Sequence, residues 1–166
     1  LMKTVSICFV CLGNICRSPT AEGVMRRLVE EAKLAEQILI DSAGTGDWHI
    51  GQPPDERAQA AAGRRGYQLA ALRGRQIAAA DFERFDLLIA MDDKNVAALR
   101  QACPAQQRDK IRLLMEFVPE ADGRWSGARE VADPYFGGAE GFEQVLDQCE
   151  AACRGLIAAL RPQLIA

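Results

Sequence analysis

Short apolar runs alternate with amphipathic segments along this chain, and that order predicts strands alternating with helices. The first apolar run covers residues 5–10. From Ser18 to Leu34, apolar residues follow at helical spacing, with charged residues mostly on the opposite face. A second apolar run at 38–40 ends at Asp41-Ser42. Strand, helix and strand in this order form a βαβ unit, which predicts a parallel pair of strands.

The rest of the chain continues this alternation. A loop rich in glycine and proline at 44–54 precedes a predicted helix from Asp55 to Arg65, and residues 67–77 have no regular pattern. We predict the later elements as a short helical turn at 78–83, strands at 87–90 and 111–114, a helix at 94–102 and a last helix from 141 or 142 to 160. Residues 119–141 carry neither pattern, and a loop of this length in a compact domain is usually functional or mobile.

Four short parallel strands with helices on both faces predict one α/β domain over residues 1–166, built as a three-layer sandwich. In an open sheet of this class the ligand lies beyond the carboxyl ends of the strands. Three polar or reactive residues follow predicted strands, namely Cys11, Ser42 and Asp92. We therefore expect them to converge with the 119–141 loop, although that loop is far away in the sequence.

The composition is that of an ordinary globular domain. Charged residues make up 26% and the net charge is −3, so bulk charge attracts neither nucleic acid nor an acidic membrane. No apolar run approaches the ~20 residues that span a bilayer, and the N-terminal run is too short for a signal peptide. Six cysteines are too few for a disulfide scaffold, so we expect a reducing, cytoplasmic location.

Candidate chemistry concentrates in residues 11–18, Cys-Leu-Gly-Asn-Ile-Cys-Arg-Ser, between the first strand and the first helix. A helix N-terminus presents unpaired N–H groups and a partial positive charge, which bind anions. Gly13 and Asn14 tolerate a positive φ, so the loop can curl until successive amides point inward. Ser18 is a favoured N-cap and Pro19 suits the first helical position.

Such a loop should hold a tetrahedral oxyanion, with Cys11 at its base and Arg17 on its rim. The guanidinium has a planar fork that matches phosphate, and the positive field favours the thiolate of the cysteine. The alternative is an ordinary strand-to-helix turn that contains a buried cysteine. The Ser-Pro helix start and a distant Asp133-Pro134 pair favour the phosphate-attacking cysteine.

A cysteine followed after five residues by Arg-Ser is similar to the signature loop of the cysteine-dependent protein tyrosine phosphatases. Its position near the N-terminus, with Asp133-Pro134-Tyr135 late in a short chain, resembles the low-molecular-weight protein tyrosine phosphatases of the bacterial type. Three further stretches agree in order, at 41–45, 46–49 and 90–92. The resemblance implies a flavodoxin-like fold with a four-stranded parallel sheet in the order 2-1-3-4, and a phosphotyrosine hydrolase without cofactor or metal.

The resemblance also assigns roles. Cys11 would attack phosphorus and form a cysteinyl-phosphate, while Arg17 and the loop amides stabilise the phosphoryl oxygens. Asp133 would protonate the leaving phenolate and later activate water. The substrate-binding residues would be Leu12, Gly13, Asn14, Ile15, Cys16, Ser18, Trp48 and Tyr135.

For several of these residues a plainer interpretation stays open. Ser42 is either a brace for the loop or an unremarkable strand-end serine. Asp92 either anchors Arg17 or simply caps the following helix, and Asp133 could belong to an Asp-Pro turn. By sequence alone, Trp48 is equally an exposed wall of the cleft or a buried plug.

The resemblance also bears on Cys16, on His49 and on Leu72. For Cys16 it implies a reversible disulfide with Cys11, and core packing is the alternative. The single histidine, His49, is expected at the rim and not as a base. Many relatives carry a histidine at the position of Leu72, bonded to the loop asparagine, so this departure puts the bracing of Asn14 in doubt.

The expected partners are phosphotyrosine-containing proteins, among them a bacterial tyrosine kinase, and we expect a monomer or a weak dimer. The nearest rival is a thiol-dependent arsenate reductase of the same fold, which would need further cysteines in a mobile segment. Here the cysteines available for such a relay are Cys103, Cys149 and Cys153. A non-catalytic anion-binding protein is a weaker alternative, because it would need no nucleophile at Cys11. An FMN protein is also weaker, because its phosphate loop would be rich in hydroxyl groups and would lack Arg17.

Overall fold

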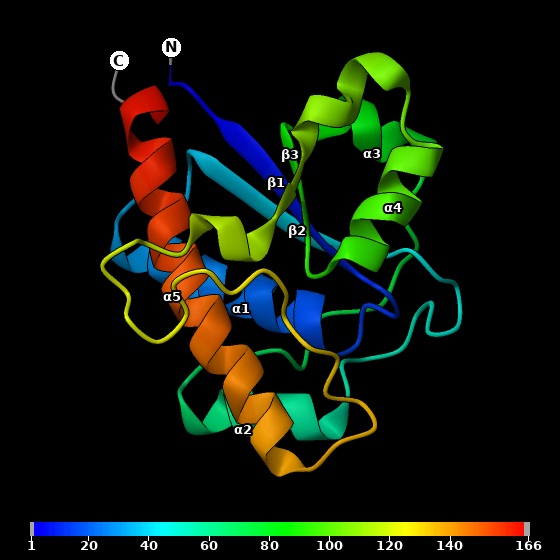
Figure 1. Cartoon of the computed structure of the whole chain (residues 1–166), viewed down its shortest axis with the longest axis vertical. Coiled ribbons are helices and arrows are strands. Elements are labelled where there is room, and N and C mark those ends of the chain that lie inside the picture. Colours follow the sequence, from blue (N-terminus) through cyan, green and yellow to red (C-terminus); the bar gives the residue numbers. More distant parts are fainter. Residues whose placement is uncertain (1, 165–166) are drawn as a thin grey trace.

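A parallel sheet of four strands forms the centre of the molecule (Figure 1). The computed structural model describes residues 2–164. In sheet order the strands are β2 (Ile38–Gly44), β1 (Val5–Cys11), β3 (Leu87–Ala90) and β4 (Ile111–Leu113). The predicted α/β architecture and the strand order 2-1-3-4 are therefore confirmed.

Helices cover both faces of the sheet (Figure 1). One face packs against α1 (Arg17–Glu31) and α5 (Ala139–Leu164), with α2 (Glu56–Arg64) lying against α5. The other face is covered by α3 (Ala79–Arg84) and α4 (Asp93–Ala102). Two short 3₁₀ helices flank β4, η1 (Ala105–Lys110) and η2 (Leu114–Phe117).

The alternation of side chains along β1 divides the core into two parts. Ile7 and Phe9 face the α1 and α5 layer, while Cys8 and Val10 face the α3 and α4 layer. Successive side chains of a strand point to opposite faces, so a strand that is apolar throughout must be covered on both. This explains why residues 5–10 read as a continuous apolar run.

Several element boundaries differ from those predicted. β2 continues past Ser42 to Gly44, because residues 42–44 pair in register with the last three residues of β1. α5 begins at Ala139 and reaches Leu164, with Pro162 inside its last turn. The 3₁₀ helices were not predicted, since their short runs carry no helical period.

The strand order places a switch point beside the first strand. The chain leaves β1 through α1 to reach β2 on one side, whereas β3 pairs with β1 on its other side, with Val10 opposite Ala90. The loops after β1 and β3 therefore diverge and leave a crevice beyond the carboxyl ends of these strands. None of the helices within residues 2–164 is both long and apolar enough to cross a membrane.

Candidate active site

The Cys11 loop, residues 12–16, curls tightly between the end of β1 and the start of α1. Asn14 adopts a left-handed conformation with a φ of 56°. Among the main-chain hydrogen bonds of residues 2–164, none has the N–H groups of residues 13–16 as donors. These amides stand at the positive end of the α1 dipole. The loop therefore offers unused donors and a positive field to an anion.

The end of β2 holds this curl in place from below. Thr45 and Gly46 donate main-chain hydrogen bonds of 2.9 Å to the carbonyl oxygens of Cys11 and Leu12. Gly44 lies directly beneath the loop, where an added Cβ would be 2.7 Å from the Leu12 oxygen. Only glycine permits this approach of two main chains.

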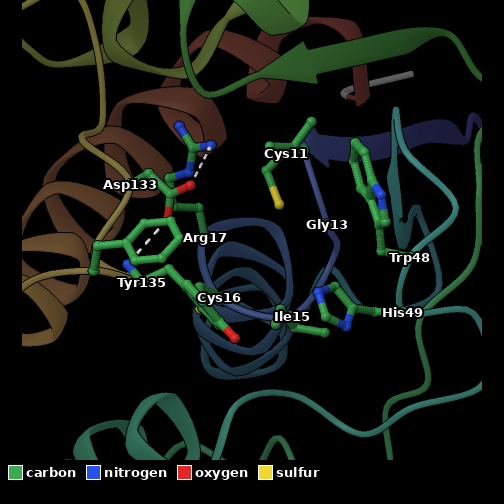
Figure 2. A pocket seen from close by; sticks show the side chains of 11 residues that line it. Cys11, Gly13, Ile15, Cys16, Arg17, Trp48, His49, Asp133 and Tyr135 are labelled. Carbon is green, nitrogen blue, oxygen red and sulfur yellow. Dashed lines mark hydrogen bonds and ion pairs between the residues drawn. The ribbon is translucent and has the colours of Figure 1, made fainter.

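Cys11 lies at the floor of a pocket formed by the loop, and its sulfur points into that pocket (Figure 2). The residue is 3% exposed. Its Sγ lies 3.0 Å from Ser18 Oγ, which also accepts a hydrogen bond of 2.8 Å from Asn14 Nδ2. Because that amide proton occupies one side of the hydroxyl oxygen, the hydroxyl can donate to the sulfur or, over 3.5 Å, to the Ala43 carbonyl oxygen. Ser18 is thus placed to form a hydrogen bond with the sulfur at the floor of the pocket.

Ser18 does not cap the helix, which corrects one prediction from the sequence. α1 begins at Arg17, Cys16 occupies the N-cap position without a side-chain cap, and Pro19 is the third helical residue. The Ser18 side chain turns inward to Cys11 because the loop has already curled over the helix start. Pro19 still lies in the first turn, where its missing N–H leaves no acceptor unsatisfied.

Arg17 lines the same pocket as Cys11 and is held by two acceptors. Its Nη1 donates to Asp92 Oδ2 at 2.6 Å and to the carbonyl oxygen of Val131 at 3.0 Å, and the side chain is 3% exposed. Burial by itself would lower its pKa, but Cys11 and the carboxylates of Asp92 and Asp133 outweigh burial and raise the pKa above the ordinary value. The guanidinium therefore remains charged although it is buried.

Asp92 performs both roles that the sequence left open. One carboxylate oxygen accepts from Arg17, and the other accepts from the main-chain N–H of Asn95 as the N-cap of α4. Asn95 in turn accepts from the main-chain N–H of Asp92 through its side chain, which completes a capping box. The start of α4 thus fixes the guanidinium.

Asp133 reaches the same pocket from a segment far away in the sequence. Its Oδ2 lies 3.7 Å from Arg17 Nη2, and its Oδ1 accepts a 3.1 Å hydrogen bond from the main-chain N–H of Tyr135 (Figure 2). The side chain is 43% exposed. A carboxyl group that is held at the mouth of the pocket can exchange protons with a bound ligand and with water.

Aromatic side chains stand on opposite sides of the pocket, with Trp48 on one side and Tyr135 on the other (Figure 2). The pocket has a volume of about 220 Å³. Trp48 is 64% exposed, so it is a wall and not a buried plug. The lining residues are Cys11, Leu12, Gly13, Ile15, Cys16, Arg17, Trp48, His49, Asp133, Tyr135 and Phe136.

Sequence comparison assigns the family. The profile described as "Low molecular weight phosphotyrosine protein phosphatase" matches residues 6–165. The "Low molecular weight protein-tyrosine-phosphatase" of Streptomyces coelicolor is 46% identical over 163 residues, which are 97% of this chain and 96% of that protein. The chain belongs to the low-molecular-weight protein tyrosine phosphatases.

Further relatives agree with this assignment. The Bacillus subtilis protein YfkJ, named a low-molecular-weight protein-tyrosine-phosphatase, is 38% identical over 96% of this chain and 97% of its own length. A crystal structure of the Entamoeba histolytica protein tyrosine phosphatase with Hepes in the active site superposes with a TM-score of 0.90. That structure is 40% identical and covers 96% of this chain and 99% of its own. This phosphatase is accordingly a hydrolase, with the Cys-x5-Arg loop of its family at Cys11 and Arg17.

The structure resolves the doubt about Asn14 in this phosphatase. Its Nδ2 donates to Ser18 Oγ at 2.8 Å and to Ser42 Oγ at 3.0 Å, while its Oδ1 accepts from the main-chain N–H of Arg75 at 3.0 Å. Leu72 packs at the edge of the core. A main-chain donor therefore braces the asparagine, without a histidine at position 72.

Ser42 is more than a strand-end serine, because it continues this chain of hydrogen bonds. Its hydroxyl donates to Glu22 Oε1 at 2.6 Å, and Glu22 also accepts from the guanidinium of Arg26 at 2.7 and 2.9 Å. Glu22 is 3% exposed. Sequence reasoning missed it because a glutamate in an amphipathic helix is indistinguishable from a solvated one. Asn14, Ser18 and Ser42 thus support the loop through their side chains and do not line the pocket.

All six cysteines are free thiols, and Cys16 lies in the Cys11 loop. Burial, with the nearby carboxylate of Asp55, raises the pKa of the Cys16 thiol to about 12. Burial likewise raises the pKa values of Cys8, Cys149 and Cys153. These thiols stay protonated at neutral pH. Within residues 2–164, no three His, Cys, Asp or Glu side chains are grouped as metal ligands.

Two further residues line the mouth of the pocket, and one of them was not predicted. His49 lies at the rim, as predicted, with its Nδ1 2.9 Å from Gln52 Oε1. Phe136 was missed, although it lines the mouth with its ring packed edge-on against Tyr135 at 4.9 Å between centroids. Its position directly after Asp-Pro-Tyr was the available signal.

Proposed function

We propose that this phosphatase hydrolyses phosphotyrosine through a cysteinyl-phosphate on Cys11. The thiolate attacks phosphorus, so that the S–P bond forms as the bond from phosphorus to the tyrosyl oxygen breaks. The amides of the Cys11 loop and Arg17 bind the three phosphoryl oxygens while charge moves among them. Each of these donors is in place before the substrate binds.

Asp133 supplies the proton balance in both steps of this proposal. In its protonated form it donates to the leaving phenolate, which departs as tyrosine. It then accepts a proton from the water that attacks phosphorus, the S–P bond breaks, and inorganic phosphate leaves from the regenerated thiolate. Such acid–base assistance typically contributes ~10²–10⁴-fold.

The observation that carries the proposal is the position of the Cys11 sulfur. It lies at the floor of a cradle of unused amides, beside a buried guanidinium that also lies 3.7 Å from the Asp133 carboxylate. Nucleophile, oxyanion site and proton donor therefore face one small volume. The guanidinium and the amides supply the positive charge that the phosphoryl group needs.

The walls of the pocket favour an aromatic phosphate ester. Trp48 and Tyr135 flank a slot at whose floor the sulfur lies, so a phenyl ring can stack between them while its phosphate reaches Cys11. A shorter phosphoserine side chain would leave its phosphate above the thiolate. The proposed partners are phosphotyrosine-containing proteins, including a bacterial tyrosine kinase, in a reducing compartment that keeps the thiol reduced.

Hydrolysis of para-nitrophenyl phosphate in the presence of EDTA tests the reaction. We expect turnover that is independent of added metal and is abolished by Cys11→Ser. The same variant should retain phosphotyrosine proteins in a pull-down, because the anion site remains intact. Turnover by Cys11→Ser at the wild-type rate would refute the proposal.

The arsenate reductase alternative gains no support. It needs accessible thiols to relay a disulfide, whereas Cys103, Cys149 and Cys153 are buried, the last two inside α5. Thiol consumption that depends on arsenate, without phosphatase turnover, would favour the reductase.

A further inference from the structure

The loop that carries Asp133, residues 118–138 between η2 and α5, is docked on the N-terminus of α4. Arg129 forms a two-pronged ion pair with Asp93, the first residue of that helix. Its Nε lies 2.9 and 3.1 Å from the two carboxylate oxygens, and its Nη2 lies 2.8 Å from Oδ1. A planar fork against a carboxylate fixes direction as well as distance.

The neighbouring residue completes the docking. Glu130 accepts a 2.7 Å hydrogen bond from the main-chain N–H of Asp93 through its carboxylate, and its carbonyl oxygen accepts from Gln148 of α5 at 3.2 Å. Val131 then donates from its N–H to the Met91 carbonyl at 2.9 Å. The chain is therefore fixed at three consecutive residues, the last of which precedes Asp133 by two positions.

Asp133 itself has little to hold it. Its side chain is 43% exposed, accepts one hydrogen bond from the main chain two residues later, and lies 3.7 Å from Arg17. Its direction therefore depends on the main chain on both sides of it, where Arg57 also donates to the Tyr135 carbonyl oxygen at 3.1 Å. Surface ion pairs add little to the free energy of unfolding, so the pair of Arg129 and Asp93 matters for aim and not for stability.

One helix start thus serves both halves of the site. Asp92 holds the guanidinium of Arg17, and the next residue, Asp93, holds the loop that delivers the carboxyl group. Because both attachments are to the same turn of α4, the distance between Arg17 and Asp133 is set by a rigid element.

We propose that Arg129 and Glu130 are positioning residues that aim Asp133 at the leaving-group oxygen by docking its loop on Asp93. The proposal rests on the proposed role of Asp133 as the acid. It predicts that loosening the dock impairs protonation of the leaving group while the oxyanion site stays intact.

The test compares Arg129→Ala with Arg124→Ala over a series of aryl phosphates. Arg124 is the matched control, because it lies in the same loop as Arg129 and forms a 2.8 Å ion pair with Asp147 of α5. Its side chain is 63% exposed, against 66% for Arg129. The substrates are phenyl, 4-nitrophenyl and 2,4-dinitrophenyl phosphate. The first has a poor leaving group that needs a proton, and the last has a good leaving group that does not.

For Arg129→Ala we expect kcat/KM for phenyl phosphate to fall about 3- to 10-fold, since misplaced catalytic groups lose part of their effect. With 2,4-dinitrophenyl phosphate the change should stay below about twofold, because little general-acid assistance is at stake. Inhibition by inorganic phosphate should not change. Arg124→Ala should match the wild type with every substrate.

Glu130 provides a second, conservative comparison. Glu130→Gln keeps an oxygen acceptor for the Asp93 N–H and should retain the wild-type dependence on the leaving group, whereas Glu130→Ala should behave like Arg129→Ala. An equal loss with all three substrates, or no difference between Arg129→Ala and Arg124→Ala, would overturn the proposal.

Asp133→Ala separates this proposal from the proposed function. If Asp133→Ala shows the loss that depends on the leaving group and Arg129→Ala does not, the dock has no catalytic role but the acid assignment stands. If Asp133→Ala shows no such dependence, the acid assignment fails and the positioning proposal fails with it.

Discussion

The Cys11 loop and the Asp133 loop meet in one pocket but are built in opposite ways. In the Cys11 loop the supporting side chains of Asn14 and Ser18 are buried and hydrogen-bonded to one another. In the Asp133 loop the reactive carboxyl group is partly exposed and has few bonds of its own. The first region is held by buried hydrogen bonds among its own side chains and to the end of β2. The second is held by the docking of Arg129, Glu130 and Val131 on the segment from Met91 to Asp93.

This difference fits the role proposed for each region. An anion site acts by preorganised donors, which lose their effect when they can reorient, so a loop with buried, hydrogen-bonded supporting side chains suits it. A general acid must exchange protons with water between turnovers, so it needs exposure. Activity should therefore be sensitive to both regions, whereas stability should be sensitive to the first alone.

Arg17→Ala should have the largest effect on both properties. We expect kcat/KM for para-nitrophenyl phosphate to fall about 10³-fold, because the charged donor of the oxyanion site is lost. The variant should also lose about 3 kcal/mol in urea unfolding, since Asp92 is left without its buried partner. Arg17→Lys keeps the charge without the planar fork, so its kcat/KM and its free energy of unfolding should lie between those of the wild type and of Arg17→Ala. Unchanged stability in Arg17→Ala would contradict the contrast between the regions.

Asp133→Ala should separate activity from stability. We expect kcat/KM for phenyl phosphate to fall about 10²-fold through loss of the proton donor. The free energy of unfolding should change by less than about 0.5 kcal/mol, as for other exposed side chains outside the core. Kinetics and urea unfolding of the same preparation check both numbers. A strongly destabilised variant would show that the Asp133 loop is part of the core after all.

The buried thiol of Cys16 lets the stability of the Cys11 loop be tested through the pH dependence of unfolding. Folding raises the pKa of Cys16 from 9.0 to about 12. Between these values the unfolded chain loses a proton that the folded chain keeps, so the free energy of unfolding falls as pH rises above 9.0. The limiting slope is about 1.4 kcal/mol per pH unit for each such thiol. Cys16→Ala should have a shallower decline between pH 8 and 10 than the wild type, as measured by urea unfolding in a reducing buffer.

Leu72→His should have the smallest effect. It introduces the histidine that the family resemblance implies at this position, but the Asn14 oxygen already accepts from the main-chain N–H of Arg75. We expect a change in kcat/KM of less than about twofold, because no hydrogen bond of the asparagine is missing. A marked gain in activity would show that the main-chain brace is an inferior substitute.

Much of the fold could be predicted because its signals are local. The apolar runs and helical periods depend on neighbouring residues, and they placed each strand of the sheet to within a few residues. The Cys11 loop was equally visible, since nucleophile, helix start and guanidinium are adjacent in the chain. The error at Ser18 has the same local origin: serine before proline favours a cap, and only the curl over Cys11 redirects its hydroxyl.

What the sequence could not supply is the set of contacts across elements. Glu22 resembles any solvated helix residue until Ser42 of β2 is placed beside it, and the docking of Arg129 on Asp93 joins residues 36 positions apart. The sequence by itself determined the alternation of elements, the Cys-x5-Arg loop and the family. Only the tertiary structure decided how the asparagine is braced and where the loop that carries Asp133 is docked, because hydrogen bonds between distant segments depend on a register and a direction that no local pattern encodes.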